Sequence, residues 1–561
     1  MINPMVYGHV VMQDSVAALP SVYSYPQLGG ISRKSKKLKV LAVVLIFLFL
    51  TLGIGNPLSW FTAKPKREIS AAELHRGPDQ IHLSLGDDPT HLTVMWSTSE
   101  HGESKVMYGS SRGDLSQIGR AKSEKLMFVD RFTNYLPYFH RASLRGLIGG
   151  RTYYYQVQTA STKSEIFSFR ASNASTHAAE RPATKMILLG GTSVDSVLLS
   201  EVNEYIVETR ANGDYDALFQ IGDLGGTLSE SGDLYMRDLQ RVSTRYPFLT
   251  VPGDHESDAE FLHYRYRFSM PGVAWPMPLD RLWYSFDLGY AHYIAYSTEI
   301  YYHHEVHIKR QLQWLLDDLI KANAKRDEYP WIIVIGHRPL YTSISPVHSA
   351  FSWLSVVRNV HQKLEDLFNW QGVDLIISSH EQMYERSWPV YKGHAVGKNY
   401  DNPKAPININ IGSRWESART FLNGFQANDW SAFQRLPDAM SRSENFAVLE
   451  TTNHTHLKWK LIRSKSGVVV DNFAIRQAKH GKFRSDGSMK FGRDILTSRQ
   501  MFLPVFYNVG YRISPWKLFC VVMVVFAVLY VTCKRCGANG DNIPSNKKAY
   551  KARDIHHVVH Y

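Results

Sequence analysis

Cysteine is scarce in this chain. Only three of its 561 residues are cysteines, and all three (Cys520, Cys533 and Cys536) lie near the carboxyl end. The long central region has none, so it must fold without disulfide bonds. Its size permits this, because a large domain buries enough apolar surface to be stable unaided. A small disulfide-linked scaffold is therefore excluded.

A nucleic-acid-binding pattern is also lacking. The formal net charge is +13, yet no basic stripe with interleaved aromatic residues is present. Much of the excess lies in the two ends, because residues 1–39 hold five basic residues against one acidic residue and residues 534–561 hold six against two. We expect no nucleic-acid partner, and we interpret the basic ends as a signal of membrane topology.

Two segments lack charge altogether. One begins at residue 40 and is almost purely aliphatic over VLAVVLIFLFLTLGIG, and the other is LFCVVMVVFAVLYVTC near the carboxyl end. A membrane-spanning helix needs about 20 apolar residues. We predict a transmembrane signal-anchor at residues 40–60 and a second transmembrane helix at residues 515–533. A cleaved signal peptide is the alternative for the first segment.

The charge pattern predicts the orientation in the membrane. Short basic flanks stay in the cytosol, so the tails 1–39 and 534–561 are expected to be cytosolic and residues 57–515 lumenal or extracellular. The expected location is the cell surface or an endolysosomal membrane. Asn173 (NAS) and Asn453 (NHT) are candidate glycosylation sites, which fits that side of the membrane.

The central region divides into two predicted domains. Residues 75–178 contain short alternating runs such as HLTVMWST and TYYYQVQT, which predict a fibronectin III-like β-sandwich. Residues 184–478 alternate continuous apolar runs with amphipathic helical stretches, which predicts strands buried on both faces in a layered α/β domain. Residues 479–514 show no clear pattern and are expected to connect this domain to the second span.

Polar residues follow several predicted strands of the second domain. They are Asp223 in IGDLGG, Asp254 and His255 in VPGDHES, His337 in VIGHRPLY and His380 in SSHEQMYERS. The carboxyl ends of strands are where α/β sheets usually bind ligands. Aspartates combined with histidines suit divalent transition metals, and a pair of metals that clamps phosphate oxygens is a familiar use of such a set.

With these motifs, the sequence resembles the purple acid phosphatases, a branch of the metallophosphoesterases. The similarity covers roughly residues 77–475 and includes RLWYSFDLGYAHYIAYSTE, PWIIVIGHRPLYTS and VDLIISSHEQMYERSWPVY. The resemblance implies a β-sandwich followed by an α/β phosphoesterase domain. It also implies acid phosphatase activity on phosphate monoesters, with His255 as proton donor or phosphate contact.

The resemblance also shows where this sequence departs from the family. The family's ferric ion is bound by an aspartate, a tyrosine and a histidine whose positions here are Gly191, Gly226 and Gln382. The matching positions of the divalent ion are kept as the bridging Asp223 together with Asp254, His337 and His380, although Asp254 replaces an asparagine. One metal position is therefore lost and the other retained.

We expect one divalent metal, zinc being the best match to two aspartates and two histidines, and no iron. One divalent ion against Asp223 and Asp254 gives a neutral centre, whereas the family's two metals leave an excess positive charge that attracts phosphate. The favoured hypothesis is a membrane-anchored pseudo-phosphatase that binds a phosphomonoester or a protein. Two alternatives stay open, an active acid phosphatase and a single-metal hydrolase. Asp195, Glu381, His348 or Gln382 would have to supply the missing ligands in an active dinuclear enzyme.

Overall fold

The computed structural model describes residues 77–88, 90–126, 137–172, 181–193, 196–209, 215–344, 355–412, 428–435 and 444–483. The two predicted membrane segments, both predicted cytosolic tails and Asn173 lie outside these residues. None of the helices within the described ranges is long and apolar enough to span a membrane.

The described part of the N-terminal domain consists of β-strands. They are β1 (Asp79–Leu85), β2 (Leu92–Thr98), β3 (Ser104–Gly109), β4 (Gln117–Lys125), β5 (Tyr138–Leu144), β6 (Thr152–Thr159), β7 (Thr162–Lys163) and β8 (Phe167–Arg170). Their hydrogen-bonded order is β1-β2-β5-β4-β3-β6-β7, with β8 beside β6. Trp96 from β2 and Tyr155 from β6 share one buried core, so the two halves of this path face each other. The fibronectin III-like assignment stays a prediction.

The second domain contains two large sheets. The strands of the first are β9 (Thr184–Leu189), β10 (Ala217–Ile221), β11 (Phe248–Val251), β21 (Asn445–Thr451), β22 (His456–Arg463) and β23 (Val469–Arg476). The strands of the second are β12 (Tyr284–Leu288), β13 (Ala291–Ala295), β14 (Trp331–Ile335), β15 (Leu375–Ser378), β16 (Tyr384–Ser387), β19 (Ile407–Asn410) and β20 (Ser431–Arg435). Their orders are β11-β10-β9-β21-β22-β23 and β12-β13-β14-β15-β19-β16-β20. A small hairpin, β17 (Val390–Tyr391) with β18 (His394–Ala395), accompanies them.

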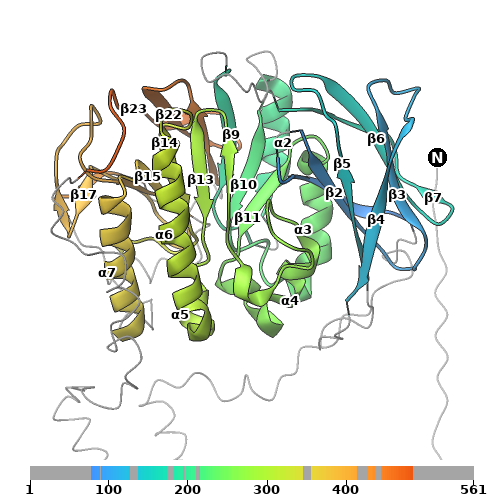
Figure 1. Cartoon of the computed structure of the whole chain (residues 1–561), viewed down its shortest axis with the longest axis horizontal. Coiled ribbons are helices and arrows are strands. Elements are labelled where there is room, and N and C mark those ends of the chain that lie inside the picture. Colours follow the sequence, from blue (N-terminus) through green and yellow to red (C-terminus); the bar gives the residue numbers. More distant parts are fainter. Residues whose placement is uncertain are drawn as a thin grey trace, which may run out of the picture. The chain divides into compact units, whose positions relative to one another are not determined.

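Helices cover these sheets (Figure 1). They are α2 (Leu198–Thr209), α3 (Leu228–Ser243), α4 (Asp258–Arg267), α5 (Ile300–His303), α6 (Ile308–Ala324) and α7 (Ser355–Trp370), with short 3-10 turns η4 (Asp254–Glu256), η5 (Leu279–Arg281) and η6 (Glu305–His307). Helix α6 buries Leu312, Leu315, Leu316 and Leu319, whose spacing places them on one helical face. This face packs with α5 and α7 against β13 and β14.

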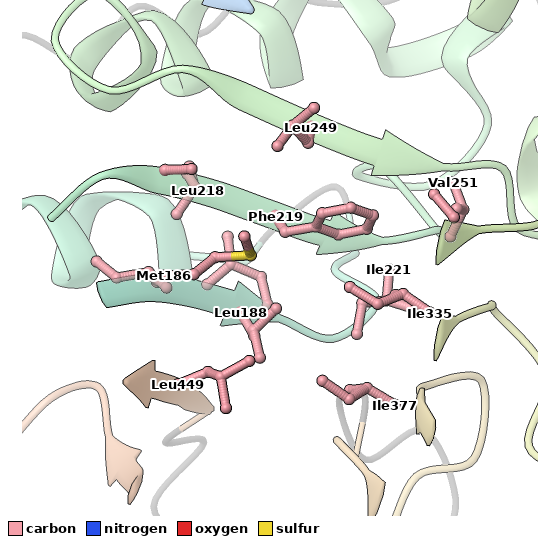
Figure 2. Packing of buried hydrophobic residues seen from close by; sticks show 14 of the residues in the cluster. Met186, Leu188, Leu218, Phe219, Ile221, Leu249, Val251, Ile335, Ile377 and Leu449 are labelled. Atoms are coloured by element: carbon pink, nitrogen blue, oxygen red, sulfur yellow. The ribbon is translucent and has the colours of Figure 1, made fainter. Parts of the chain in front are cut away.

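The main core lies where the two sheets meet. Figure 2 shows Leu188 and Ile221 of the first sheet close to Ile335 and Ile377 of the second. Strands β9, β10 and β11 are parallel, as are β13, β14, β15 and β19. Parallel strands buried on both faces require nearly continuous apolar sequence, which explains runs such as WIIVI in β14.

The N-terminal domain packs directly against α3 and α4. The Tyr155 hydroxyl donates a hydrogen bond to the carbonyl oxygen of Thr244 at 2.9 Å, and this hydrogen bond is buried. Arg267, which is 4% exposed, donates to the side-chain oxygen of Gln80 at 2.8 Å. These buried polar contacts join the two domains at defined points, because an unpaired buried donor would cost stability.

Candidate metal centre

Four side chains converge where strands of both sheets end. Asp223 follows β10, Asp254 follows β11, His337 follows β14 and His380 follows β15. One ligand atom from each lies within 4.8 Å of those of the other three. In the part of the chain that the structure describes, this is the only such group of three or more His, Cys, Asp or Glu side chains. The structure thus brings together all four residues predicted to hold the divalent ion.

The two histidines approach the same carboxylate oxygen. Nε2 of His337 lies 3.1 Å from Oδ1 of Asp254 and 3.4 Å from Oδ1 of Asp223. Nδ1 of His380 lies 3.1 Å from the same Asp254 oxygen. Nδ1 of the buried His337 is 2.8 Å from the carbonyl oxygen of Ile221, which directs its Nε2 toward the carboxylates.

The donor set fits one divalent ion. Oδ1 of Asp223 is buried and makes no hydrogen bond, although Nε2 of His337 lies 3.4 Å away. A buried polar atom without a partner costs free energy, and a carboxylate oxygen more so, unless a cation or donor meets it. Two carboxylates and two imidazoles form a four-ligand set of the kind that zinc takes. Asp223, Asp254, His337 and His380 are the residues that would hold the ion.

The backbone at the centre is strained in ways that place these ligands. Asp223 has φ 54° and His380 has φ 66°, so two non-glycine ligands lie in the left-handed region. Such residues each cost about 1–3 kcal/mol and are concentrated at functional sites. At Gly222 a Cβ atom would lie 2.5 Å from Nδ1 of His337, so only glycine permits this close approach.

A buried carboxylate below the centre joins two of the ligand loops. Glu256 is 2% exposed and accepts hydrogen bonds of 2.8 Å from the backbone N–H groups of Asp223, Leu224 and Gly253. Burial, followed by the charge of Asp223, raises the pKa of Glu256 to about 7. The side chain fixes the loop that carries Asp223 relative to the loop that carries Asp254.

Electrostatics at the centre favour positive charge. Burial lowers the pKa of His337, but the carboxylates of Asp223, Asp254 and Glu299 outweigh it and raise that pKa to about 10. Burial alone would raise the pKa of Asp254, whereas hydrogen bonds from His337 and His380 hold it well below its usual range. The carboxylates therefore attract a second proton to His337 when they have no other cation.

His255 lies at the rim of the centre rather than among its ligands. Its side chain is exposed and it is not one of the four converging residues. Partial burial lowers the pKa of His255, but the nearby carboxylates of Asp223, Asp254 and Glu256 raise it overall. A protonated imidazole here is placed to meet an anion that approaches the centre.

Two of the three positions that depart from the family pattern, Gly191 and Gly226, have little freedom to accept a side chain. A Cβ atom on Gly191 would lie 2.8 Å from Cβ of Asp223, closer than real Cβ contacts. The N–H of Gly191 donates to Oγ of Ser379 at 3.0 Å, and the N–H of Thr192 donates to the carbonyl oxygen of Asp223 at 2.8 Å. Gly226 has φ 85°, which disfavours any side chain. Hydrogen bonds within the protein thus occupy the region beside Asp223.

Candidate replacement ligands do not complete a second metal position in the described residues. Asp195 and His348 lie outside those residues. Glu381 and Gln382 are half-buried, and neither residue belongs to the converging group. Asn453, the second candidate glycosylation site, is exposed.

Sequence reasoning missed Arg338 and Glu299 as parts of the centre. Nη1 of Arg338 lies 2.8 Å from Nε2 of His380, and its other nitrogens contact the fully buried carboxylate of Glu299 at 2.8 and 3.0 Å. The available signal was the charged residue directly after the strand-end histidine in GHRPLY.

Comparison with known proteins identifies the family. Residues 78–171 match the model described as purple acid phosphatase, N-terminal domain, and residues 197–384 match calcineurin-like phosphoesterase. Acid phosphatase type 7 of Homo sapiens is 33% identical over 422 residues, covering 72% of this chain and 92% of the relative. The chain belongs to the purple acid phosphatase family. Acid phosphatase type 7 of Danio rerio is 34% identical over 430 residues, with 72% and 92% coverage.

A solved purple acid phosphatase supports the fold. The enzyme PPD1 from yellow lupin (Lupinus luteus) seeds aligns with a TM-score of 0.58 and 20% identity over 78% of each chain. The predicted family is confirmed, as is the predicted order of an N-terminal β domain and an α/β metallophosphoesterase domain. This member of the purple acid phosphatase family therefore has a grouped set of Asp and His side chains at its strand ends.

Proposed function

We propose that this purple acid phosphatase family member binds one divalent ion, zinc, and hydrolyses phosphate monoesters weakly or not at all. Its role would be that of a membrane-anchored binding protein for a phosphomonoester or a protein ligand. The observation that carries the proposal is the crowding beside Asp223, because a Cβ atom on Gly191 would lie 2.8 Å from Cβ of Asp223. The left-handed φ of Gly226 adds a second obstacle at the position of the family's tyrosine.

Charge supports weak or absent catalysis. A divalent ion held by the carboxylates of Asp223 and Asp254 leaves a neutral centre, because Arg338 is already paired with Glu299. Catalysis of phosphoryl transfer by metal ions relies on the positive charge of the ions exceeding the negative charge of their protein ligands. A phosphate dianion would therefore be attracted weakly, with the exposed His255 as a cationic group near the centre.

The bound ion would supply Lewis acidity to an oxygen atom that reaches it. The chain's own residues limit that chemistry. Asp223, Asp254, His337 and His380 already form a four-ligand set, which is typical of structural zinc sites, whereas catalytic sites keep an open position. A fully ligated ion would stabilise the loops around it, and these loops would then form a stable surface for binding.

Active acid phosphatase is the second candidate. Relatives named acid phosphatase type 7, at 33–34% identity, favour it. The rim position and raised pKa of His255 also suit a group that gives a proton to a leaving oxygen. This candidate requires a second metal or another source of positive charge.

Membrane anchoring through residues 40–60 and 515–533 is part of the proposal. It is supported by the two charge-free segments and the basic tails beside them. The metal centre would then face the lumen or the outside of the cell, where phosphomonoesters or the exposed domains of other proteins are its available ligands.

The test uses the purified full-length chain. Bound metals are counted by mass spectrometry, and hydrolysis of p-nitrophenyl phosphate is measured from pH 4 to 8 against the Asp223→Ala variant as background. We expect one zinc per chain and turnover equal to that background. Two metals per chain, with turnover that Asp223→Ala abolishes, would establish the active enzyme instead.

A further inference from the structure

A large cavity lies between the two domains, away from the metal centre. Its volume is about 750 Å³. In the α/β domain it is lined by residues that precede strands, such as Asp216 before β10, Pro247 before β11 and Tyr329 before β14. The turn between β1 and β2 and the end of β8 line it from the β domain.

The cavity and the metal centre are at opposite ends of the same strands. Asp223 follows β10, whereas Asp216 precedes it. A strand rises about 3.3 Å per residue, so the five residues of β10 separate the two places by about 17 Å. A molecule in the cavity would therefore not touch the metal ligands.

The size and the lining of the cavity are typical of a small-molecule site. Ligand pockets have volumes of about 300–1,000 Å³ and are lined mainly by apolar and aromatic residues, with a few polar groups among them. Leu147, Leu288, Tyr215 and Tyr329 are among the lining residues here. The cavity can therefore enclose an organic molecule with an apolar body.

Negative charge predominates among the charged residues of the lining. Five lining residues are acidic (Asp87, Asp88, Asp216, Asp287 and Glu328) and four are basic, with His292 included. Arg181, one of the four, donates a hydrogen bond to the carboxylate of Glu328 at 2.7 Å. The imidazole of His292 lies between two carboxylates, with Asp287 at 2.6 Å and Asp318 at 3.0 Å. A cationic ligand is therefore favoured over an anionic one.

Asp287 is a carboxylate held in a fixed position in the wall of the cavity. It is half-buried and lies directly opposite His292 in the β12–β13 pair. Its Oδ1 is 2.6 Å from Nδ1 of His292, and a carboxylate has about four acceptor positions, so its other oxygen can accept from a ligand. Burial, followed by the charge of Asp287, raises the pKa of Tyr329 to about 12, which places this phenol in the field of the carboxylate.

We propose that this cavity is a second binding site, separate from the metal centre, for an organic amine. The protonated amine donates a charge-assisted hydrogen bond to Asp287, and the apolar body lies against the aliphatic and aromatic lining. The site goes beyond the function proposed above, because it depends neither on the bound ion nor on phosphatase activity.

Three probes that share an indole ring test the class of ligand. Tryptamine carries an ammonium group, tryptophol a neutral hydroxyl group and indoleacetate a carboxylate. Their binding to the purified full-length chain is measured by isothermal titration calorimetry at neutral pH. We expect tryptamine to bind about 10-fold more tightly than tryptophol, because only its cation is attracted by the net negative charge of the lining, and indoleacetate to bind most weakly.

Two variants test where the probes bind. Asp287→Asn removes the charge and keeps an oxygen that can pair with His292, so it should weaken tryptamine binding by about 10–100-fold and tryptophol binding by less. Ala183→Trp places a large side chain at an exposed residue of the lining and should weaken the binding of all three probes. Because Ala183 is exposed, this second variant keeps the test decisive if Asp287→Asn fails to fold.

Two control variants change carboxylates outside the cavity. Asp366→Asn alters a side chain on α7 that is 22% exposed, and Asp223→Ala removes a metal ligand. Neither residue lines the cavity, so both variants should bind tryptamine as the wild type does.

Undetectable tryptamine binding overturns the site. Binding that Ala183→Trp leaves unchanged also overturns it, as does binding that Asp223→Ala abolishes, since the probe would then lie elsewhere or at the metal centre. Equal affinity for the three probes, or an equal loss of tryptamine and tryptophol binding in Asp287→Asn, rejects the amine as the ligand. None of these results bears on the count of bound zinc, which tests the metal centre separately.

Discussion

Restoring the family's three missing ligand types should not restore a second metal position. The perturbation is the triple variant Gly191→Asp, Gly226→Tyr and Gln382→His. A Cβ atom at position 191 would lie 2.8 Å from Cβ of Asp223, and such overpacking costs about 1–3 kcal/mol. A tyrosine at φ 85° costs about 1–2 kcal/mol more. The variant should therefore lose about 2–5 kcal/mol of unfolding free energy while gaining no bound ion.

Urea unfolding of the purified chain measures this loss, and two glycine controls separate its causes. Gly146→Ala has φ 66° with open space around the new Cβ, so it reports the cost of the left-handed backbone alone. Gly113→Ala has open space and no such φ, so it reports the background cost. Metal counting and p-nitrophenyl phosphate hydrolysis complete the assay. A triple variant as stable as wild type, with two ions per chain and new turnover, would refute the reasoning.

Three further outcomes follow from the same contacts. Asp223→Asn should abolish the stabilisation that zinc gives, which is about 2.7 kcal/mol at a hundredfold excess over Kd; a thermal midpoint that still falls on chelation would contradict this. Glu256→Gln should cost about 1–3 kcal/mol in urea unfolding, because the amide cannot accept from all three backbone N–H groups that Glu256 now satisfies; unchanged stability would contradict the role given to that side chain. Burial lowers the pKa of His292, but Asp287 and Asp318 raise it to about 9. Because the folded pKa of His292 exceeds the ordinary 6.5, its protonation contributes about 3 kcal/mol to the unfolding free energy below pH 6.5, and this contribution is lost as the pH rises through 9. Asp318→Asn should reduce this dependence of the unfolding free energy on pH. Urea unfolding at a series of pH values measures it.

The grouping of metal ligands could be predicted because it depends on strand ends. Asp223, Asp254, His337 and His380 each follow an apolar run, and the carboxyl ends of parallel strands collect polar residues at one edge of each of the two sheets. The local pattern of an apolar run followed by a polar residue is sufficient to identify such residues. The same reasoning predicted the change from a β domain to an α/β domain near residue 184.

Contacts between distant segments could not be predicted in this way. The hydrogen bond from Arg338 to His380 joins residues 42 positions apart. The crowding at Gly191 is likewise a property of packing, because sequence shows that a ligand is missing but not that its space is filled. Glu256 lies within the VPGDHES stretch of the sequence, yet its three backbone partners appear only in the folded chain.

The buried hydrogen bonds between the two domains have a consequence for how the molecule comes apart. Tyr155 and Gln80 of the β domain are bound to Thr244 and Arg267 of the α/β domain. Pulling the β domain away would leave the buried guanidinium of Arg267 without the Gln80 partner and expose apolar surface on α3 and α4. Calorimetry should therefore record one cooperative melting event, and a protease that cuts between the domains should release no stable fragment. The α/β domain then needs the β domain in order to stay folded, and the two domains form one cooperative folding unit.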